Sequence, residues 1–89
     1  MSEAEFEVVS ELGLHARPAG EFAAEAGKYI AEIYVARAGS DDWVSARSVL
    51  SLLSLAASQG TRLVIRAEGA DADAALAALG ALLVRPQAS

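Results

Sequence analysis

The 89-residue chain contains a single histidine, and the residues around it set up a specific chemistry. His15 lies in the run Gly13-Leu-His-Ala-Arg-Pro18, after a strand-like segment and directly before a helix-like one. The start of a helix presents backbone N–H groups without intrahelical acceptors, together with the positive end of the helix dipole. Imidazole titrates near neutral pH, so a usable fraction of it is an uncharged nucleophile. This placement predicts that His15 can take up and release a phosphoryl group.

Arg17 and Pro18 strengthen this interpretation. Arg17 supplies a permanent cation with a planar fork of donors that matches the oxygens of a phosphate. Pro18 suits the first turn of a helix, where its missing N–H costs least. A positive helix end and a guanidinium together stabilise an incoming dianion. We expect no metal ion and no cofactor, because phosphoryl transfer depends mainly on positioning and on charge stabilisation.

Length and composition exclude several classes of protein. The chain is long enough for one compact domain, which we expect to span residues 1–89, and its 54% hydrophobic content argues against disorder. It has no cysteine, which excludes disulfides and thiolate metal sites. No apolar run reaches the about 18–20 residues that membrane insertion needs, and no signal peptide is visible, so we expect a cytoplasmic protein. The net charge of −5 argues against binding to nucleic acid.

The spacing of apolar residues predicts seven elements in the order βαββαβα, an α+β fold with helices on one face of a largely antiparallel sheet. Within it, Phe6 and Val8 should share a face, and Ile30 should continue the apolar stripe of the first helix. Trp43 should cover the sheet edge or the hairpin, and Asp71 or Asp73 should cap the last helix. The predicted strands are 5–10, 32–37, 43–46 and 61–67, and the predicted helices are 16–30, 48–58 and 74–84.

The stretch Gly13–Ala19 resembles the active-site signature of HPr, the histidine-containing phosphocarrier of the bacterial phosphoenolpyruvate-dependent sugar phosphotransferase system. Further matches follow in register at Lys28-Tyr29, at the helix-forming run Arg47–Leu55, and at Gly69-Ala-Asp71. The resemblance therefore covers nearly the whole chain. It implies an open-faced β-sandwich, in which four antiparallel strands in the order 1-4-2-3 are covered by three helices.

The resemblance also implies an activity. His15 would accept a phosphoryl group at Nδ1 from phosphorylated enzyme I and pass it to the IIA domain of a sugar permease. Arg17 would assist the transfer, and the backbone amides of Ala16 and Arg17 would hold the phosphate. The chain would then be a phosphocarrier with a phosphohistidine, a component of a phosphotransferase and not itself an enzyme, and we expect a monomer.

The second predicted helix carries the remaining candidates. Ser48 matches the regulatory serine of the family, which a dedicated serine kinase phosphorylates in some bacteria, although serine is also a favoured N-cap residue with a purely structural role. Val49, Leu50 and Leu53 would form the exposed apolar patch that docks partners. Helical spacing alone does not separate this patch from core positions such as Leu52.

Some residues depart from the pattern of the family and leave alternatives open. Leu12, Gly20 and Ala24 stand where many members carry polar side chains, and Glu21 adds negative charge near the docking surface. The chain could therefore serve a nitrogen-related or regulatory phosphorelay, or feed a dihydroxyacetone kinase. A further alternative is a regulatory binding module that works through Ser48 without carrying phosphate.

Overall fold

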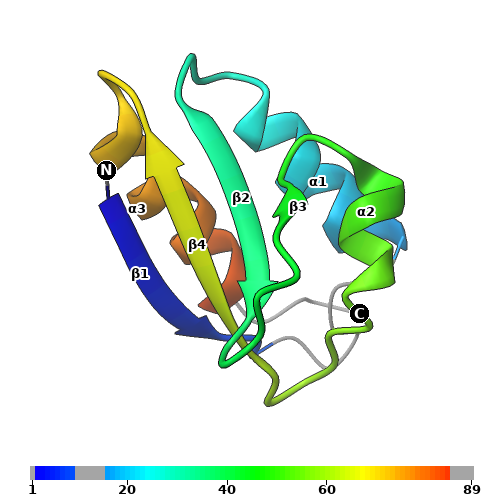
Figure 1. Cartoon of the computed structure of the whole chain (residues 1–89). Coiled ribbons are helices and arrows are strands. Elements are labelled where there is room, and N and C mark those ends of the chain that lie inside the picture. The colour runs from blue at the N-terminus through cyan, green and yellow to red at the C-terminus, as the bar shows by residue number, and fades with distance from the viewer. Residues whose placement is uncertain (1, 10–15, 85–89) are drawn as a thin grey trace.

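The structure, a computed structural model, describes residues 2–9 and 16–84. It has the predicted element order and one antiparallel sheet with the strand order β1-β4-β2-β3. Helices α1 and α3 lie behind the sheet, and α2 lies beside α1 near the edge formed by β3 (Figure 1). The elements are β1 (Ser2–Glu7), α1 (Ala16–Ala26), β2 (Glu32–Arg37), β3 (Val44–Ser45), α2 (Val49–Ser54), β4 (Arg62–Glu68) and α3 (Ala72–Val84). The predicted α+β fold is confirmed.

The hydrophobic core lies between the sheet and the helices. The inner strand β4 contributes Leu63, Ile65 and Ala67 to it. In β4 the buried residues alternate with exposed or half-buried ones, as period-two geometry requires. Ile65 is fully buried and pairs with Ala4 on β1 and with Val35 on β2, so one apolar row crosses these strands. Leu79 of α3 is also fully buried, as the helical spacing of its leucines predicts.

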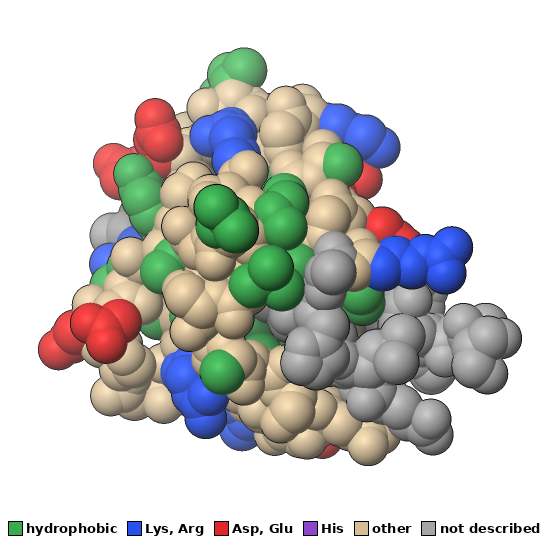
Figure 2. Space-filling view, turned by 90° about the vertical axis from the view of Figure 1, so that its right-hand side faces the viewer, with side chains coloured by type: hydrophobic (Ala, Val, Ile, Leu, Met, Phe, Trp, Pro, Cys, Tyr) green, Lys and Arg blue, Asp and Glu red, His purple; other side chains and the backbone are tan. Residues whose placement is uncertain are grey.

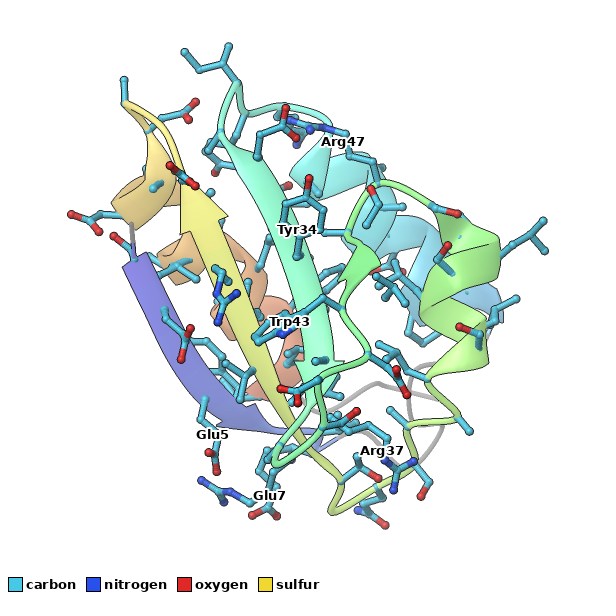
Figure 3. The ribbon with its side chains drawn as sticks, viewed as in Figure 1. Glu5, Glu7, Tyr34, Arg37, Trp43 and Arg47 are labelled. Atoms are coloured by element: carbon cyan, nitrogen blue, oxygen red, sulfur yellow. The ribbon has the colours of Figure 1, made fainter. Side chains whose placement is uncertain are left out.

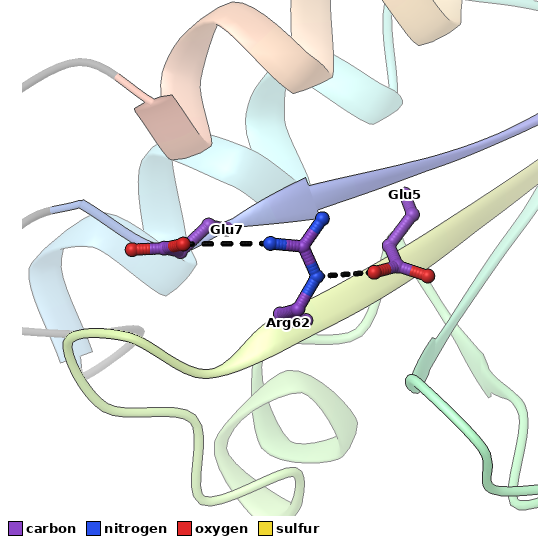
Figure 4. A network of polar contacts seen from close by, with 3 residues as sticks. All are labelled: Glu5, Glu7 and Arg62. Carbon is purple, nitrogen blue, oxygen red and sulfur yellow. Dashed lines mark hydrogen bonds and ion pairs between the residues drawn. The ribbon is translucent and has the colours of Figure 1, made fainter.

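The other face of the sheet is polar, and none of the helices in the described ranges covers it (Figure 1). Arg62 forms ion pairs with Glu5 and with Glu7, which stand on the neighbouring strand (Figure 4). The guanidinium of Arg66 stacks over the ring of Trp43 at 4.1 Å from its centroid, and the indole lies across the open face of the sheet (Figure 3). Trp43 is expected at the sheet edge or the hairpin, but its ring contacts Arg66 of the inner strand β4, because the cation stacks on the indole across the open face. Exposed ion pairs contribute at most about 1 kcal/mol each, so this face is mainly a solvated one.

Helix α1 is shorter than the apolar spacing predicts. Its last residue is Ala26, and Gly27 N still donates to the carbonyl four residues back, at 3.0 Å. Lys28 N and Tyr29 N then donate to carbonyls three residues back, at 3.0 and 3.3 Å, which tightens the turn and ends the helix. Ile30 is 79% exposed, so the prediction that it continues the buried stripe is wrong.

Strand β1 spans Ser2–Glu7, earlier in the chain than the predicted range 5–10. Its first residues are mostly polar, so apolar alternation did not indicate where the strand begins. It pairs with β4 from Ser2 opposite Ala67 to Glu7 opposite Arg62. Val8 follows the strand and is buried in the core, against which the half-buried Phe6 also packs. The predicted shared face of these two side chains is therefore confirmed.

Helix α2 stops at Ser54, before the predicted end at residue 58. The amide of Leu55 donates to the carbonyl of Leu52 and the amide of Ala56 to the carbonyl of Leu53, both at 3.1 Å, which closes the last turn. Ala56 then adopts a positive φ of 53°, a left-handed conformation that an L-residue takes as a single helix-ending position.

The turn before α3 is joined to the turn after α1. The carboxylate of Asp71, expected as a helix cap, instead accepts hydrogen bonds from Ile30 N and Ala31 N, both at 2.9 Å. Gly69 has a φ of 145°, and a Cβ there would lie 2.8 Å from the Cα of Ala31. Asp73 lies in the first turn of α3, where a carboxylate is favourable. Within the described ranges, no helix has the length and apolar character that crossing a bilayer requires.

Candidate functional site

The start of α1 is the first part of the candidate site. The helix begins at Ala16, the residue that follows His15 in the chain, and places Arg17 and Pro18 in its first turn. First-turn N–H groups have no intrahelical acceptors, so the amides of Ala16 and Arg17 stand where the sequence predicts anion-binding donors. His15 itself lies outside the described residues, and its role stays a prediction.

Arg17 differs from every other basic residue that the structure describes. Its side chain is exposed, and no described group forms a hydrogen bond or an ion pair with it. Each of the other lysines and arginines in residues 2–9 and 16–84 has a partner: Lys28, Arg37, Arg47, Arg62 and Arg66. The guanidinium of Arg17 therefore keeps all of its donors for solvent or for a bound anion.

Ser48 is the N-cap of α2. Its backbone is extended, with φ −103° and ψ 111°, and its hydroxyl accepts a hydrogen bond from Ser51 N at 3.2 Å. The side chain is half-buried. Ser48 therefore has the structural role of an N-cap. Its regulatory role stays a prediction.

The structure separates the two faces of α2, which helical spacing alone did not. Leu50 is 81% exposed and Val49 37% exposed, whereas Leu52 is fully buried. Leu53 is half-buried and packs against the core, so it forms the edge of the patch. We call Val49, Leu50 and Leu53 the α2 patch. In Figure 2 apolar side chains gather on the face that carries α2, with basic and acidic side chains around them.

Buried residues of α1 and α2 hold these two helices side by side. Ala19 and Phe22 of α1, together with Leu52 and Leu55 at α2, belong to the same core cluster. Because both helices are anchored in one core, the first turn of α1 and the α2 patch keep a defined spatial relation. Glu21 of α1 is exposed.

The end of α1 carries a small polar cluster at the Lys28-Tyr29 match. The Lys28 ammonium lies 3.0 Å from the carboxylate of Glu25, and the Tyr29 hydroxyl donates to the same carboxylate at 3.2 Å. The hydrogen bond from Lys28 lowers the pKa of Glu25, against partial burial that raises it. Burial and the neighbouring Glu25 raise the pKa of the Tyr29 hydroxyl.

Two arginines that the sequence analysis did not single out hold the ends of α2. Arg47 Nη2 donates to the carbonyl oxygens of Tyr29 and Ala31, the latter at 2.9 Å. Arg37 Nη1 donates to Leu55 O at 3.0 Å. All three acceptors are main-chain carbonyls, which carry no side-chain signature, so the sequence offers only the position of Arg47 directly before an N-cap. No metal-binding group of three or more His, Cys, Asp or Glu side chains occurs in the part of the chain described.

The strand order and the helix arrangement define an HPr-like open-faced β-sandwich, and solved structures share it. HPr from Bacillus anthracis matches with a TM-score of 0.86 and 36% identity, over 92% of this chain and 95% of that chain. An HPr dimer from Thermoanaerobacter tengcongensis matches with a TM-score of 0.67 and 38% identity, over 89% of this chain and 88% of that chain.

Sequence comparison identifies the family. The family model described as the PTS HPr component phosphorylation site matches residues 2–85. The phosphocarrier protein HPr of Haloferax volcanii is 44% identical over 81 residues, which are 91% of each chain. The chain belongs to the HPr family, the histidine-containing phosphocarriers of the phosphoenolpyruvate-dependent sugar phosphotransferase system.

Proposed function

We propose that this chain carries a phosphoryl group on His15 from phosphorylated enzyme I to the IIA domain of a sugar permease. In the first transfer a bond forms between Nδ1 of His15 and phosphorus while the bond between enzyme I and phosphorus breaks. In the second, the IIA domain attacks the same phosphorus and the imidazole leaves. The carrier acts as a cytoplasmic monomer, and membership of the HPr family supports this proposal.

The observation that carries the proposal is the unpartnered Arg17 in the first turn of α1. A guanidinium that is already bound to a carboxylate would have to break that contact before binding a phosphate. Arg17 has no such contact among the described residues, so its donors are available without that cost. The first-turn amides of α1 add donors on the same side of the helix end. Together they favour a dianion placed next to the start of α1.

The α2 patch supports the docking step. Leu50, at 81% exposure, presents a large apolar side chain to water, and a partner that covers it gains the free energy of burial. Because α2 packs against α1, we infer that a partner seated on the patch also reaches the start of α1. We infer that enzyme I and the IIA domain cover the patch in turn.

Ser48 is the site where this docking would be regulated. A phosphate on its hydroxyl would place a dianion beside Val49 and would disfavour an apolar or acidic partner surface. Such regulation requires a serine kinase, and a phosphorylase to reverse it. A partner from a nitrogen-related relay or a dihydroxyacetone kinase would use the same histidine and the same patch.

Arg17 variants test the proposal through initial rates of phosphorylation by phosphoenolpyruvate, Mg²⁺ and enzyme I. For Arg17→Gln we expect a rate about 100-fold lower, the scale of losing one preorganised donor to a developing charge. Arg17→Lys should lie between this variant and the wild type, because it keeps the charge but loses the planar fork. Arg62→Gln, on the open face of the sheet, is the matched control and should transfer within about twofold of the wild type. A wild-type rate for Arg17→Gln would refute the role of Arg17.

A further inference from the structure

We propose that Arg47 is a positioning residue that fixes the N-terminal end of α2 against the end of α1, and so sets the geometry of the α2 patch for partner binding. This inference rests on the proposed function, because it concerns the surface through which the phosphoryl group is exchanged. It assigns to Arg47 a role in recognition that acts through its hydrogen bonds to the carbonyls of Tyr29 and Ala31.

The contacts of Arg47 span two segments that are distant in sequence. Its Nη2 donates to the carbonyls of Tyr29 and Ala31, the latter at 2.9 Å, in the turn that follows α1. Figure 3 shows Arg47 next to the end of α1 and before α2. Hydrogen bonds from a charged donor are stronger than those between neutral groups. Since Ser48 directly follows Arg47, this contact holds the N-cap of α2 in place.

The turn that receives Arg47 is itself held from its other side. The carboxylate of Asp71 accepts hydrogen bonds from Ile30 N and Ala31 N, both at 2.9 Å. The amides of the turn thus bind to the start of α3, while its carbonyls bind Arg47. Because this turn is hydrogen-bonded on both sides, it fixes the N-terminal end of α2 relative to α1 and α3.

Helix α2 needs such an anchor because it is short. It has six residues, and a helix of this length has little stability of its own. Leu52 anchors its middle in the core, and Arg37 binds the carbonyl of Leu55 at its C-terminal end. Arg47 holds the other end, next to Val49 and Leu50. Loss of Arg47 should therefore disturb the patch, whereas loss of Arg37 should disturb the opposite end.

The experiment measures phosphorylation of the chain by enzyme I as a function of chain concentration, for the wild type, Arg47→Gln, Arg47→Lys and Arg37→Gln. For Arg47→Gln we expect the KM for the chain to rise about tenfold, equivalent to about 1.4 kcal/mol of binding, with kcat within about twofold. For Arg47→Lys the KM should rise by about threefold, since the lysine side chain is shorter overall and its ammonium lacks the planar fork of donors. Arg37→Gln is the matched control, and its KM should stay within about twofold of the wild type.

The outcomes separate this inference from the proposed function. If the wild type is phosphorylated but Arg47→Gln keeps its KM, or loses kcat instead, the inference is refuted and the proposed function stands. An equal rise of the KM in Arg37→Gln would also refute the inference, because loosening either end of α2 would then weaken partner binding. If Arg47→Gln does not fold, Arg47→Lys decides, and an unchanged KM in that variant refutes the inference. A wild type that enzyme I neither binds nor phosphorylates refutes both.

Discussion

The hydroxyl of Ser48 accepts a hydrogen bond from the amide of Ser51 at 3.2 Å, so one oxygen atom both caps α2 and is the expected site of regulatory phosphorylation. A change at this position should therefore alter helix stability and, if Ser48 is phosphorylated, regulation together. The two effects can be separated, because aspartate caps a helix about as well as serine but also carries a negative charge.

We predict that Ser48→Ala lowers the free energy of unfolding by about 1 kcal/mol, through loss of the cap, and leaves phosphoryl transfer unchanged at temperatures where the variant is folded. Ser48→Asp should keep the stability within about 0.5 kcal/mol and slow the transfer, because its charge lies beside the α2 patch. Urea unfolding and initial transfer rates measure the two quantities. Equal transfer rates for the two variants would contradict a regulatory role of charge at this position.

The α2 patch can be tested with two side chains of nearly equal exposure. Leu50 is 81% exposed and Ile30 is 79% exposed, but Ile30 lies in the turn after α1. Leu50→Glu should raise the KM of transfer by about tenfold, because a charge replaces an apolar contact with the partner. Ile30→Glu should leave the KM unchanged. Both should change stability by no more than about 0.5 kcal/mol, as exposed positions do. A similar KM for both variants would show that the patch has no special part in docking.

The two faces of α2 illustrate why the candidate site was only partly predictable. The run Val49–Leu55 is apolar at most positions, so periodicity does not show which leucines face the core. Burial is decided by where α2 rests against α1 and β3, which depends on contacts far apart in the sequence. The resemblance predicts an exposed Leu50 and a buried Leu52, which the structure confirms, whereas helical spacing alone does not give this division.

Glu25 should titrate below its ordinary value of about 4.5, since the hydrogen bond from Lys28 favours its charged form. A pKa that is lower in the folded than in the unfolded state stabilises the fold above the unfolded pKa. This contribution is lost as the pH falls through the lowered pKa. NMR titration of the Glu25 carboxyl carbon measures the value directly. Lys28→Met should raise it toward 4.5, and a wild-type midpoint at or above 4.5 would contradict the prediction.

Gly69 and Gly60 form a matched pair for the packing of the turn before α3. Both have a positive φ, 145° and 91°, but only Gly69 would bring a Cβ within 2.8 Å of backbone, at Ala31. Gly60→Ala should therefore lower the free energy of unfolding only by the conformational strain, about 1 kcal/mol. Gly69→Ala should cost about 3 kcal/mol, because the clash forces a backbone shift as well. Urea unfolding compares them, and equal losses would contradict the close approach.

The element order was predictable because the strands alternate and the helices carry apolar residues at spacings of three and four, and the strand order followed from the resemblance. The ends of the elements were not predictable, as Ile30 shows. Its spacing fits the apolar stripe of α1, yet the helix ends at Ala26, where the turn tightens after Gly27. The hydrogen bond that Ala31 N of that turn donates to the Asp71 carboxylate joins residues 40 positions apart in the sequence, and no local pattern indicates it.

The central claim is tested most directly by incubation of the chain with phosphoenolpyruvate, Mg²⁺ and a competent enzyme I, followed by measurement of the intact mass. The account predicts the added mass of one phosphoryl group, labile in acid and stable in base, as expected of a phosphohistidine. The label should persist in Ser48→Ala and disappear in His15→Ala, since His15 is the only histidine. Label on His15→Ala, or no label on the wild type, would contradict the account.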